Sequence, residues 1–167
     1  MTLSAAPPKS LDELTLGGDM SLEELVSRDG LAEVIKSANE LFGVPIRVFT
    51  EDGKLLADAA DSIELYAYLN TSRAGRAALS EVVAAVKALA PGPDGEAHYT
   101  CVTGALYRVA AIVYDSRQIG RMILGPFLPD PSQEPPASLL TLDTQLDADN
   151  LRALFRKLPK SDPQTVS

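Results

Sequence analysis

The sequence predicts an α+β domain in which an antiparallel sheet of about five strands is flanked by helices. Residues 96–129 hold most of the strand-like sequence of the 167-residue chain and form three successive segments, separated by Gly104 and by a turn at 115–117. A further hairpin is predicted at 45–58, because Asp52-Gly53 stands between two apolar runs. The short connections within each group favour antiparallel pairing, since parallel strands need long crossovers.

Two helices are expected before the first hairpin. Residues 1–20 are expected to form a flexible tail with a short helix, because Ser, Ala and Pro dominate its start. A capping box, Ser21-Leu-Glu-Glu24, predicts the next helix start. Asp29 is expected to cap a longer helix over about 30–42, which ends at Gly43. Its apolar residues recur at helical spacing: Leu31, Val34, Ile35, Ala38, Leu41 and Phe42.

Two more helices are predicted between the hairpin and the three strands. Asp61 or Ser62 can cap a short helix that ends near Leu69. Asn70-Thr71-Ser72 then breaks the chain and caps a second helix over about 73–90, whose lean apolar face consists of Ala77, Ala78, Val82, Val86 and Leu89. Small side chains on this face suit close packing against a sheet.

The chain after the strands is rich in proline. Five prolines between Pro126 and Pro136 predict that the sheet ends near Gly125, because proline is excluded from central strands. Residues 130–146 are expected to form a connector, followed by a last helix over 148–158. Residues 147–167 as a whole are interpreted as a C-terminal helix and a linker toward an output domain.

The second hairpin predicts which side chains share a face. If its turn centres on Ser116, one face carries Tyr107, Val109, Ala111, Val113, Ile119, Arg121, Ile123 and Gly125. The other face carries Leu106, Arg108, Ala110, Ile112, Gly120, Met122 and Leu124. Both faces are largely apolar, so both should be covered, one by helices and the other by terminal helices or a partner subunit.

Composition excludes several classes of function. A formal net charge of −8 argues against a surface for nucleic acid or for an anionic membrane. The sequence has no apolar run of membrane-spanning length and no signal peptide, which makes the cytoplasm the default location. One cysteine and one histidine exclude an internal disulfide and a Cys- or His-rich metal site, and no cofactor is expected.

The residues with reactive side chains favour structural roles. Cys101 is interpreted as a small buried side chain rather than a redox sensor, because no Lys, Arg or His lies beside it on its strand face. His98 lacks the companions of a catalytic triad, so a surface histidine is favoured. For Arg108 and Arg121, a structural ion pair is favoured over a ligand carboxylate. A small hydrolase is disfavoured, since no nucleophile, base or metal set is present.

The predicted order of elements is the outline of the PAS and GAF sensor folds. Residues 21–129 resemble the PocR ligand-binding domain, a PAS-like sensory module of bacterial signalling proteins. The resemblance rests on three stretches in the same order: LAEVIKSANELFGVPIRVFTEDGKLL, TSRAGRAAL and YTCVTGALYRVAAIVYDSRQIGRMILGPF. In that family, a Cys shortly before a Gly opens the long hairpin (here Cys101 and Gly104), and a Gly-containing strand end closes it (here 124–127).

The chain departs from the family pattern in two places. Family members commonly carry a second cysteine early in the helical insert, where residues 64–69 of this chain have none, so a paired-thiol role is not carried over. The usual strand end is followed by a polar residue such as Gln, where this chain has Pro126-Phe127.

The resemblance implies a ligand pocket between the sheet and the helices of residues 61–90. The candidate ligand-binding residues are Val48, Tyr66, Leu69, Tyr99, Cys101, Gly104, Tyr107, Arg121, Ile123 and Gly125. At Gly104 and Gly125, the missing side chains leave room for a ligand or for a close backbone, while simple strand termination explains them equally well. The tyrosines suit a small, partly polar ligand, and suit an ordinary core as well.

The function implied is that of a non-enzymatic, cytoplasmic small-molecule sensor in a bacterial two-component kinase or transcriptional regulator. Its ligand would be a diol, a carboxylate or a hydrocarbon derivative. A homodimer and an output domain are the expected partners, with no contact to nucleic acid or membrane. The alternative is a dimerisation or protein-interaction module that has the same fold and a degenerate pocket.

Overall fold

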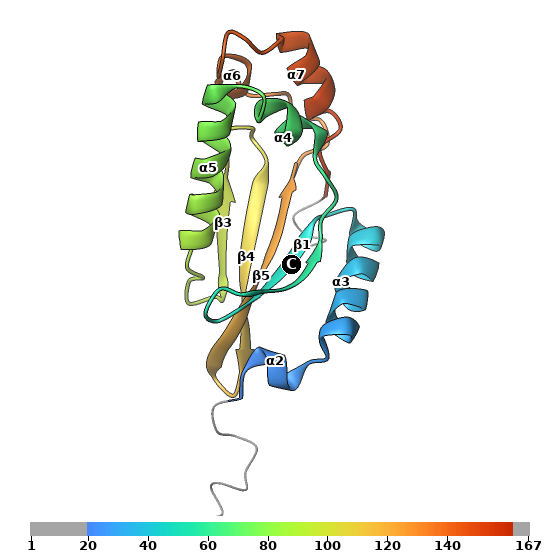
Figure 1. Cartoon of the computed structure of the whole chain (residues 1–167), viewed down its shortest axis with the longest axis vertical. Coiled ribbons are helices and arrows are strands. Elements are labelled where there is room, and N and C mark those ends of the chain that lie inside the picture. The colour runs from blue at the N-terminus through green and yellow to red at the C-terminus, as the bar shows by residue number, and fades with distance from the viewer. Residues whose placement is uncertain (1–19, 162–167) are drawn as a thin grey trace, which may run out of the picture.

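The computed structural model describes residues 20–161 and shows one antiparallel sheet with helices on both faces (Figure 1). The strands are β1 (Ile46–Thr50), β2 (Leu55–Ala59), β3 (Glu96–Thr100), β4 (Leu106–Tyr114) and β5 (Arg117–Phe127), in the spatial order β2-β1-β5-β4-β3. Every neighbouring pair is antiparallel, which confirms the predicted α+β class. Residues 1–19 of the tail predicted at 1–20, and the end of the chain from 162, lie outside the described residues.

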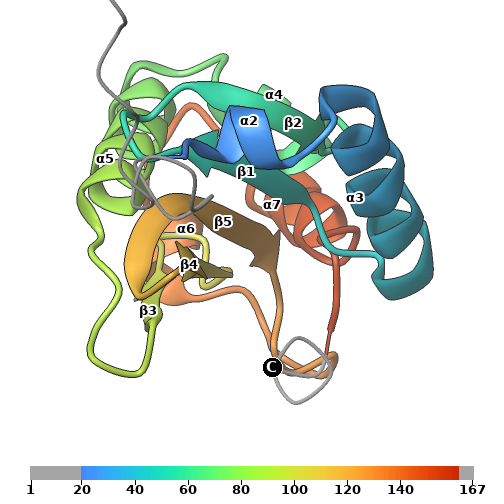
Figure 2. The same cartoon turned by 90° about the horizontal axis from the view of Figure 1, so that it is seen from below.

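Six helices surround the sheet in the described part of the chain. They are α2 (Leu22–Leu25), α3 (Arg28–Phe42), α4 (Glu64–Leu69), α5 (Arg73–Ala88), α6 (Ala137–Leu140) and α7 (Ala148–Phe155). Figure 2 shows α3 and α5 on opposite sides of the strands, and Figure 1 shows α4, α6 and α7 together at the upper end of the sheet. Among the described residues, no helix is long and apolar enough to cross a membrane.

Each face of the sheet has its own core. The first core packs α4, α5, α6 and α7 on one face; its buried residues include Leu65, Leu69, Val82, Val86, Cys101, Tyr107, Val109, Ile123, Leu139, Leu151 and Phe155. The second core packs α2 and α3 on the other face; its buried residues include Leu22, Ile35, Val44, Ile46, Val48, Leu56, Ile119, Leu124 and Phe127. Coverage of both faces agrees with the expectation drawn from their apolar side chains.

Ile119 does not lie on the face that the hairpin pattern predicts. The predicted register holds from Arg108 opposite Leu124 to Ile112 opposite Gly120, and then shifts before Val113, which pairs with Gln118. Ile119 is therefore an extra residue on β5, and it packs in the second core rather than beside Tyr107. The turn itself is formed by two residues, Asp115 and Ser116, with φ of 48° and 62°.

The sheet also continues beyond Gly125, where the proline pattern predicts its end. Strand β5 reaches Phe127, which pairs with Leu106, and the next pair is Arg108 with Leu124. Gly125 and Pro126 thus stand together opposite Tyr107, in a bulge. The missing N–H of Pro126 breaks no regular ladder bond there, so the strand accommodates a proline that a regular ladder would exclude.

Several helix ends differ by a few residues from their predicted positions. Ser27, not Asp29, caps α3, because its Oγ accepts a hydrogen bond from the N–H of Gly30. Neither Asp61 nor Ser62 caps α4, which begins after Ile63. Helix α6 lies inside the predicted connector, and α7 ends three residues before Leu158. The predicted start at Ser21 is confirmed, since the Glu24 carboxylate accepts from the Ser21 N–H at 2.7 Å.

Candidate functional site

A large cleft lies between the sheet and helices α4 and α5. Its volume is about 840 Å³, within the range of small-molecule pockets. The sheet contributes Arg47, Phe49, Leu55, Tyr107, Ile123 and Pro126; the connection into α4 contributes residues 60–63; α4 and the following residue contribute Tyr66, Ala67 and Asn70; α5 contributes Leu79, Val82, Val83, Val86 and Lys87. Most of these side chains are apolar, so the cleft suits a largely hydrophobic molecule.

Ser72 and Gly75 determine how α5 follows α4 in the wall of the cleft. The Oγ of Ser72 accepts a hydrogen bond from the N–H of Gly75 at 3.0 Å and so begins α5 directly after α4. At Gly75, a Cβ atom would lie 2.0 Å from the carbonyl oxygen of Leu69. Only glycine permits this close approach of the two helices, which places α5 along the cleft.

The inner end of the cleft contains a chain of buried polar side chains. The Tyr107 hydroxyl donates to the Tyr66 hydroxyl at 3.1 Å. The Tyr66 Oη lies 3.6 Å from the Cys101 Sγ, which is 2.9 Å from the Thr103 Oγ1. Burial raises the pKa of Tyr66 and raises the pKa of Tyr107 to about 12, so both phenols are neutral near pH 7. They offer polar contacts without charge.

The opposite end of the cleft carries positive charge. Lys87 lies at the end of α5, and its carbonyl oxygen accepts a hydrogen bond from Arg121 Nη1 at 2.7 Å. The Arg121 guanidinium also lies over the Phe49 ring, 5.8 Å from its centroid. Between the two ends, Arg47, in register with Ile123, is paired with Asp58 at 3.4 Å. Within residues 20–161, no carboxylate forms an ion pair with Lys87, an exposed residue that lines this end of the cleft.

The structure brings three of the predicted ligand-binding residues to the cleft: Tyr66, Tyr107 and Ile123. Leu69 and Cys101 lie in the same core without lining the cleft, and Tyr99 packs against that core. Val48 lies in the core on the other face of the sheet. Arg121 contacts the cleft-lining residues Lys87 and Phe49 without lining the cleft itself. A ligand-binding role stays a prediction for each of them.

The chain itself fills the space beside the two predicted glycines. At Gly125, with φ of 117°, a Cβ atom would lie 2.6 Å from the Leu106 carbonyl oxygen. At Gly104, it would lie 2.7 Å from Nε2 of Gln133, which donates to the Gly104 carbonyl oxygen. Close approach of other chain segments, rather than ligand space, therefore accounts for both glycines in the structure.

The sequence predicted a pocket beside the helices of residues 61–90, but it identified neither Phe49 nor any side chain of α5 as lining residues. The apolar stripe of α5 predicted a helix packed on the sheet, and Val82 and Val86 belong to that stripe. No pattern in the stripe indicates that the helix leaves a gap beside them. The gap depends on where α4 and the residues before it stand, which is a tertiary property.

The remaining charged candidates have structural partners. Arg108 is buried, and its Nε donates to the Glu96 carboxylate at 2.9 Å, which confirms the predicted structural ion pair. Among the residues that the structure describes, no carboxylate pairs with Arg121, which contacts the Lys87 carbonyl group instead. His98 is on the surface, with its Nε2 3.9 Å from the same Glu96 carboxylate. In the described part of the chain, no three Cys, His, Asp or Glu side chains gather as a metal site.

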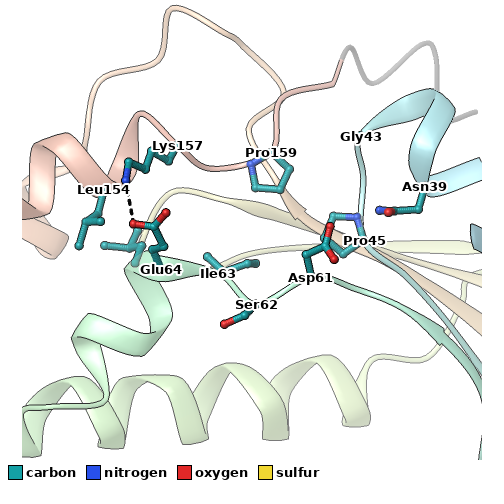
Figure 3. Close-up of a pocket in the computed structure, with 11 residues that line it drawn as sticks. Asn39, Gly43, Pro45, Asp61, Ser62, Ile63, Glu64, Leu154, Lys157 and Pro159 are labelled. Carbon is teal, nitrogen blue, oxygen red and sulfur yellow. Dashed lines mark hydrogen bonds and ion pairs between the residues drawn. The ribbon is translucent and has the colours of Figure 1, made fainter.

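A second, smaller cavity adjoins the cleft. It has a volume of about 300 Å³ and lies between the end of α3, the start of α4 and the segment around α7 (Figure 3). Residues 61–63 line both cavities. An ion pair of 2.7 Å joins Glu64 of α4 to Lys157, both largely exposed. This smaller cavity marks the junction at which α4 meets the C-terminal helix.

Comparison with known proteins gives one family. The family model for the sensory domain found in PocR matches residues 24–167. No curated protein and no solved structure matches the chain. The match reaches past residue 129, where the resemblance seen in the sequence ended, and includes α6 and α7. The chain therefore belongs to the family of PocR sensory domains.

Proposed function

We propose that this domain senses a small molecule in the cytoplasm, as the non-catalytic input module of a bacterial two-component sensor kinase or transcriptional regulator. The family is one of sensory domains, and the cleft of about 840 Å³ is the observation that carries the proposal. The ligand would lie between the sheet and helices α4 and α5, where Tyr66, Tyr107 and Ile123 meet. The absence of any His or Cys among the cleft-lining residues supports a binding site rather than an active site.

Binding would change the position of α4, and α4 is joined to the C-terminal helix. Glu64 pairs with Lys157, and the Tyr68 hydroxyl accepts a hydrogen bond from the N–H of Asp147, the residue that caps α7, at 2.9 Å. A ligand that favours one position of α4 would therefore favour one position of α7. From α7, the change would pass to a second copy of the chain or to an output domain.

A thermal-shift screen with small diols, carboxylates and aromatic compounds tests the proposal. A ligand that binds only the folded state raises the melting temperature, by an amount that grows with the logarithm of its concentration above Kd. Ala67→Trp places a large ring at the cleft and should abolish the shift. The matched control is Val34→Trp, on the exposed side of α3, which should keep the shift. A screen without any hit, or hits that survive Ala67→Trp, would contradict a sensor built on this cleft.

An interaction module is the second candidate, and the exposed face of α3 favours it. Val34 and Leu41 are 66% and 75% exposed although they belong to the apolar stripe of the helix. In that case, the chain would form a dimer or dock a partner through α3 and would bind no ligand. Light scattering over a range of concentrations tests the dimer, and a strict monomer would count heavily against it.

A further inference from the structure

The cleft is large compared with a small diol. One water-sized group occupies roughly 30 Å³, so a three-carbon diol with five heavy atoms would fill only about 150 Å³. The cleft has about 840 Å³. Such a diol would therefore leave most of the apolar wall in contact with water.

The strand register gives the length of the cleft. Its inner end lies at Tyr107, beside Gly125 of β5, and its outer end lies at Lys87, whose carbonyl group is bonded to Arg121 of the same strand. Four residues of a strand separate these two levels, which corresponds to about 13 Å. A carbon chain advances somewhat less than its bond length of about 1.5 Å per atom, so about ten carbons span this distance.

The middle of the cleft is largely apolar along this length, apart from the Arg47 guanidinium. Val82 and Val86 of α5 face Ile123 and Phe49 of the sheet across the cleft. Phe49 is in register with Arg121, and Arg47 is in register with Ile123. An aliphatic or aromatic body would bury its surface against these side chains, at about 25 cal/mol for each Å² of apolar area.

The two ends of the cleft differ in charge. Asp61 is shared between the cleft and the smaller cavity that adjoins its inner end, where its carboxylate lies near Pro45 (Figure 3). The neutral phenols of Tyr66 and Tyr107 lie at the same end. Lys87 supplies a positive charge at the outer end.

Arg47 also lines the cleft, between the two ends, but it is already paired with Asp58 at 3.4 Å. Within residues 20–161, no carboxylate pairs with Lys87, so a negatively charged head group is favoured at the outer end.

We infer that the ligand of this cleft is an elongated amphipathic monocarboxylate, with its head group at Lys87 and an apolar body of about ten carbons running toward Tyr66 and Tyr107. This inference rests on the proposed function, because it assigns a ligand class to the same cleft. One ammonium matches one singly charged carboxylate, and the phenols close the inner end with uncharged groups.

Calorimetric titration of the full chain with decanoate, decanol and 1,2-propanediol tests the inference. Decanoate should bind more tightly than decanol, and propanediol more weakly than either. Lys87→Gln should weaken decanoate binding by about five- to tenfold, as expected for loss of a charge-assisted contact, and change decanol binding by less than about twofold. Lys36→Gln is the matched control, since Lys36 lies on α3 and pairs only weakly with Glu40 at 4.0 Å.

A series of carboxylates from hexanoate upward adds a second measurement. Each added methylene should raise the affinity about three- to fourfold until the chain reaches about ten carbons, after which the gain should stop. Three results would overturn the carboxylate inference and keep the cleft as a ligand site. They are equal affinities for decanol and decanoate, equal effects of Lys87→Gln on both compounds, and tightest binding of propanediol. If none of these compounds binds and the wider screen also gives no hit, the sensing proposal itself fails.

Discussion

Two tyrosines, Tyr66 and Tyr107, pack in the first core and also line the cleft. Their hydroxyl groups are bonded to each other at 3.1 Å and lie at the inner end of the cleft. The bond gives the Tyr107 hydroxyl a partner, and a buried hydroxyl without a partner costs about 1–3 kcal/mol. The pair keeps the inner wall ordered and leaves it uncharged.

The Tyr107 phenol makes the free energy of unfolding fall as the pH rises from about 10 to about 12. The unfolded chain has an ordinary tyrosine pKa of about 10, whereas burial raises the pKa of native Tyr107 to about 12. In this window the unfolded state has lost a proton that the native state retains, so unfolding becomes more favourable; below about pH 10 the contribution is fully present. Urea titrations at several pH values measure the slope.

Tyr107→Phe should make that slope smaller, whereas Tyr114→Phe, at an exposed position, should leave it unchanged. Equal slopes in all three proteins would show that the burial of Tyr107 has no effect on its proton affinity.

Gly125→Ala should destabilise the domain by about 2 kcal/mol or more, because a positive φ and a close contact act together. The φ is 117°, and the new Cβ would lie 2.6 Å from the Leu106 carbonyl oxygen. Gly43→Ala is the control: its φ of 68° is also positive, but no atom lies within 4 Å of the added Cβ. Its cost should be about 1 kcal/mol. Denaturant midpoints measure both, and similar losses would argue against the close contact in β5.

At the scale of elements, the helix α5 depends on its first residues. Ser72→Ala should cost about 1–2 kcal/mol, since it removes the buried acceptor of the Gly75 N–H. Ser80→Ala is the matched control on the exposed side of the same helix, where the hydroxyl only donates to the Arg76 carbonyl group. Its effect should be within about 0.5 kcal/mol of zero. The outcome is measured by thermal or urea unfolding, and a larger loss at Ser80 than at Ser72 would contradict this account of α5.

The type of nearly every element was predictable from local patterns, while the irregular positions were not. Periodicity identified α3 and α5, and Asp-Gly identified the first hairpin. The bulges at Ile119 and at Gly125-Pro126 depend on cross-strand pairing, which no local pattern encodes. Pro126 therefore predicts too early an end for β5, because whether a proline fits within a strand depends on its pairing with the neighbouring strand.

For the whole molecule, the C-terminal helix is part of the core rather than an appendage. Phe155 of α7 is 1% exposed and packs in the core that contains Leu65, Leu69 and Val109. The chain after α7 is also fixed, since the Leu128 N–H donates to the Pro159 carbonyl oxygen at 2.7 Å. The sequence predicted the helix itself, but its place in the core follows from tertiary packing that extends over most of the chain.

Phe155→Ala should lower the free energy of unfolding by about 3–5 kcal/mol, because it leaves a cavity beneath α4. Arg152→Ala, on the exposed side of the same helix, should cost less than about 1 kcal/mol. Chemical denaturation followed by circular dichroism gives both values. A small loss at Phe155 would mean that α7 is only loosely attached.

The position of α4 between the cleft and α7 has a thermodynamic consequence. Tyr66 on this six-residue helix lines the cleft, while Glu64 and Tyr68 contact the segment that carries α7. If a ligand strengthens the docking of α7 by some factor, the docking of α7 must strengthen ligand binding by that same factor, because the two equilibria share one thermodynamic cycle. Under the proposed function, anything that changes the docking of α7 would thereby change the ligand concentration at which this domain responds.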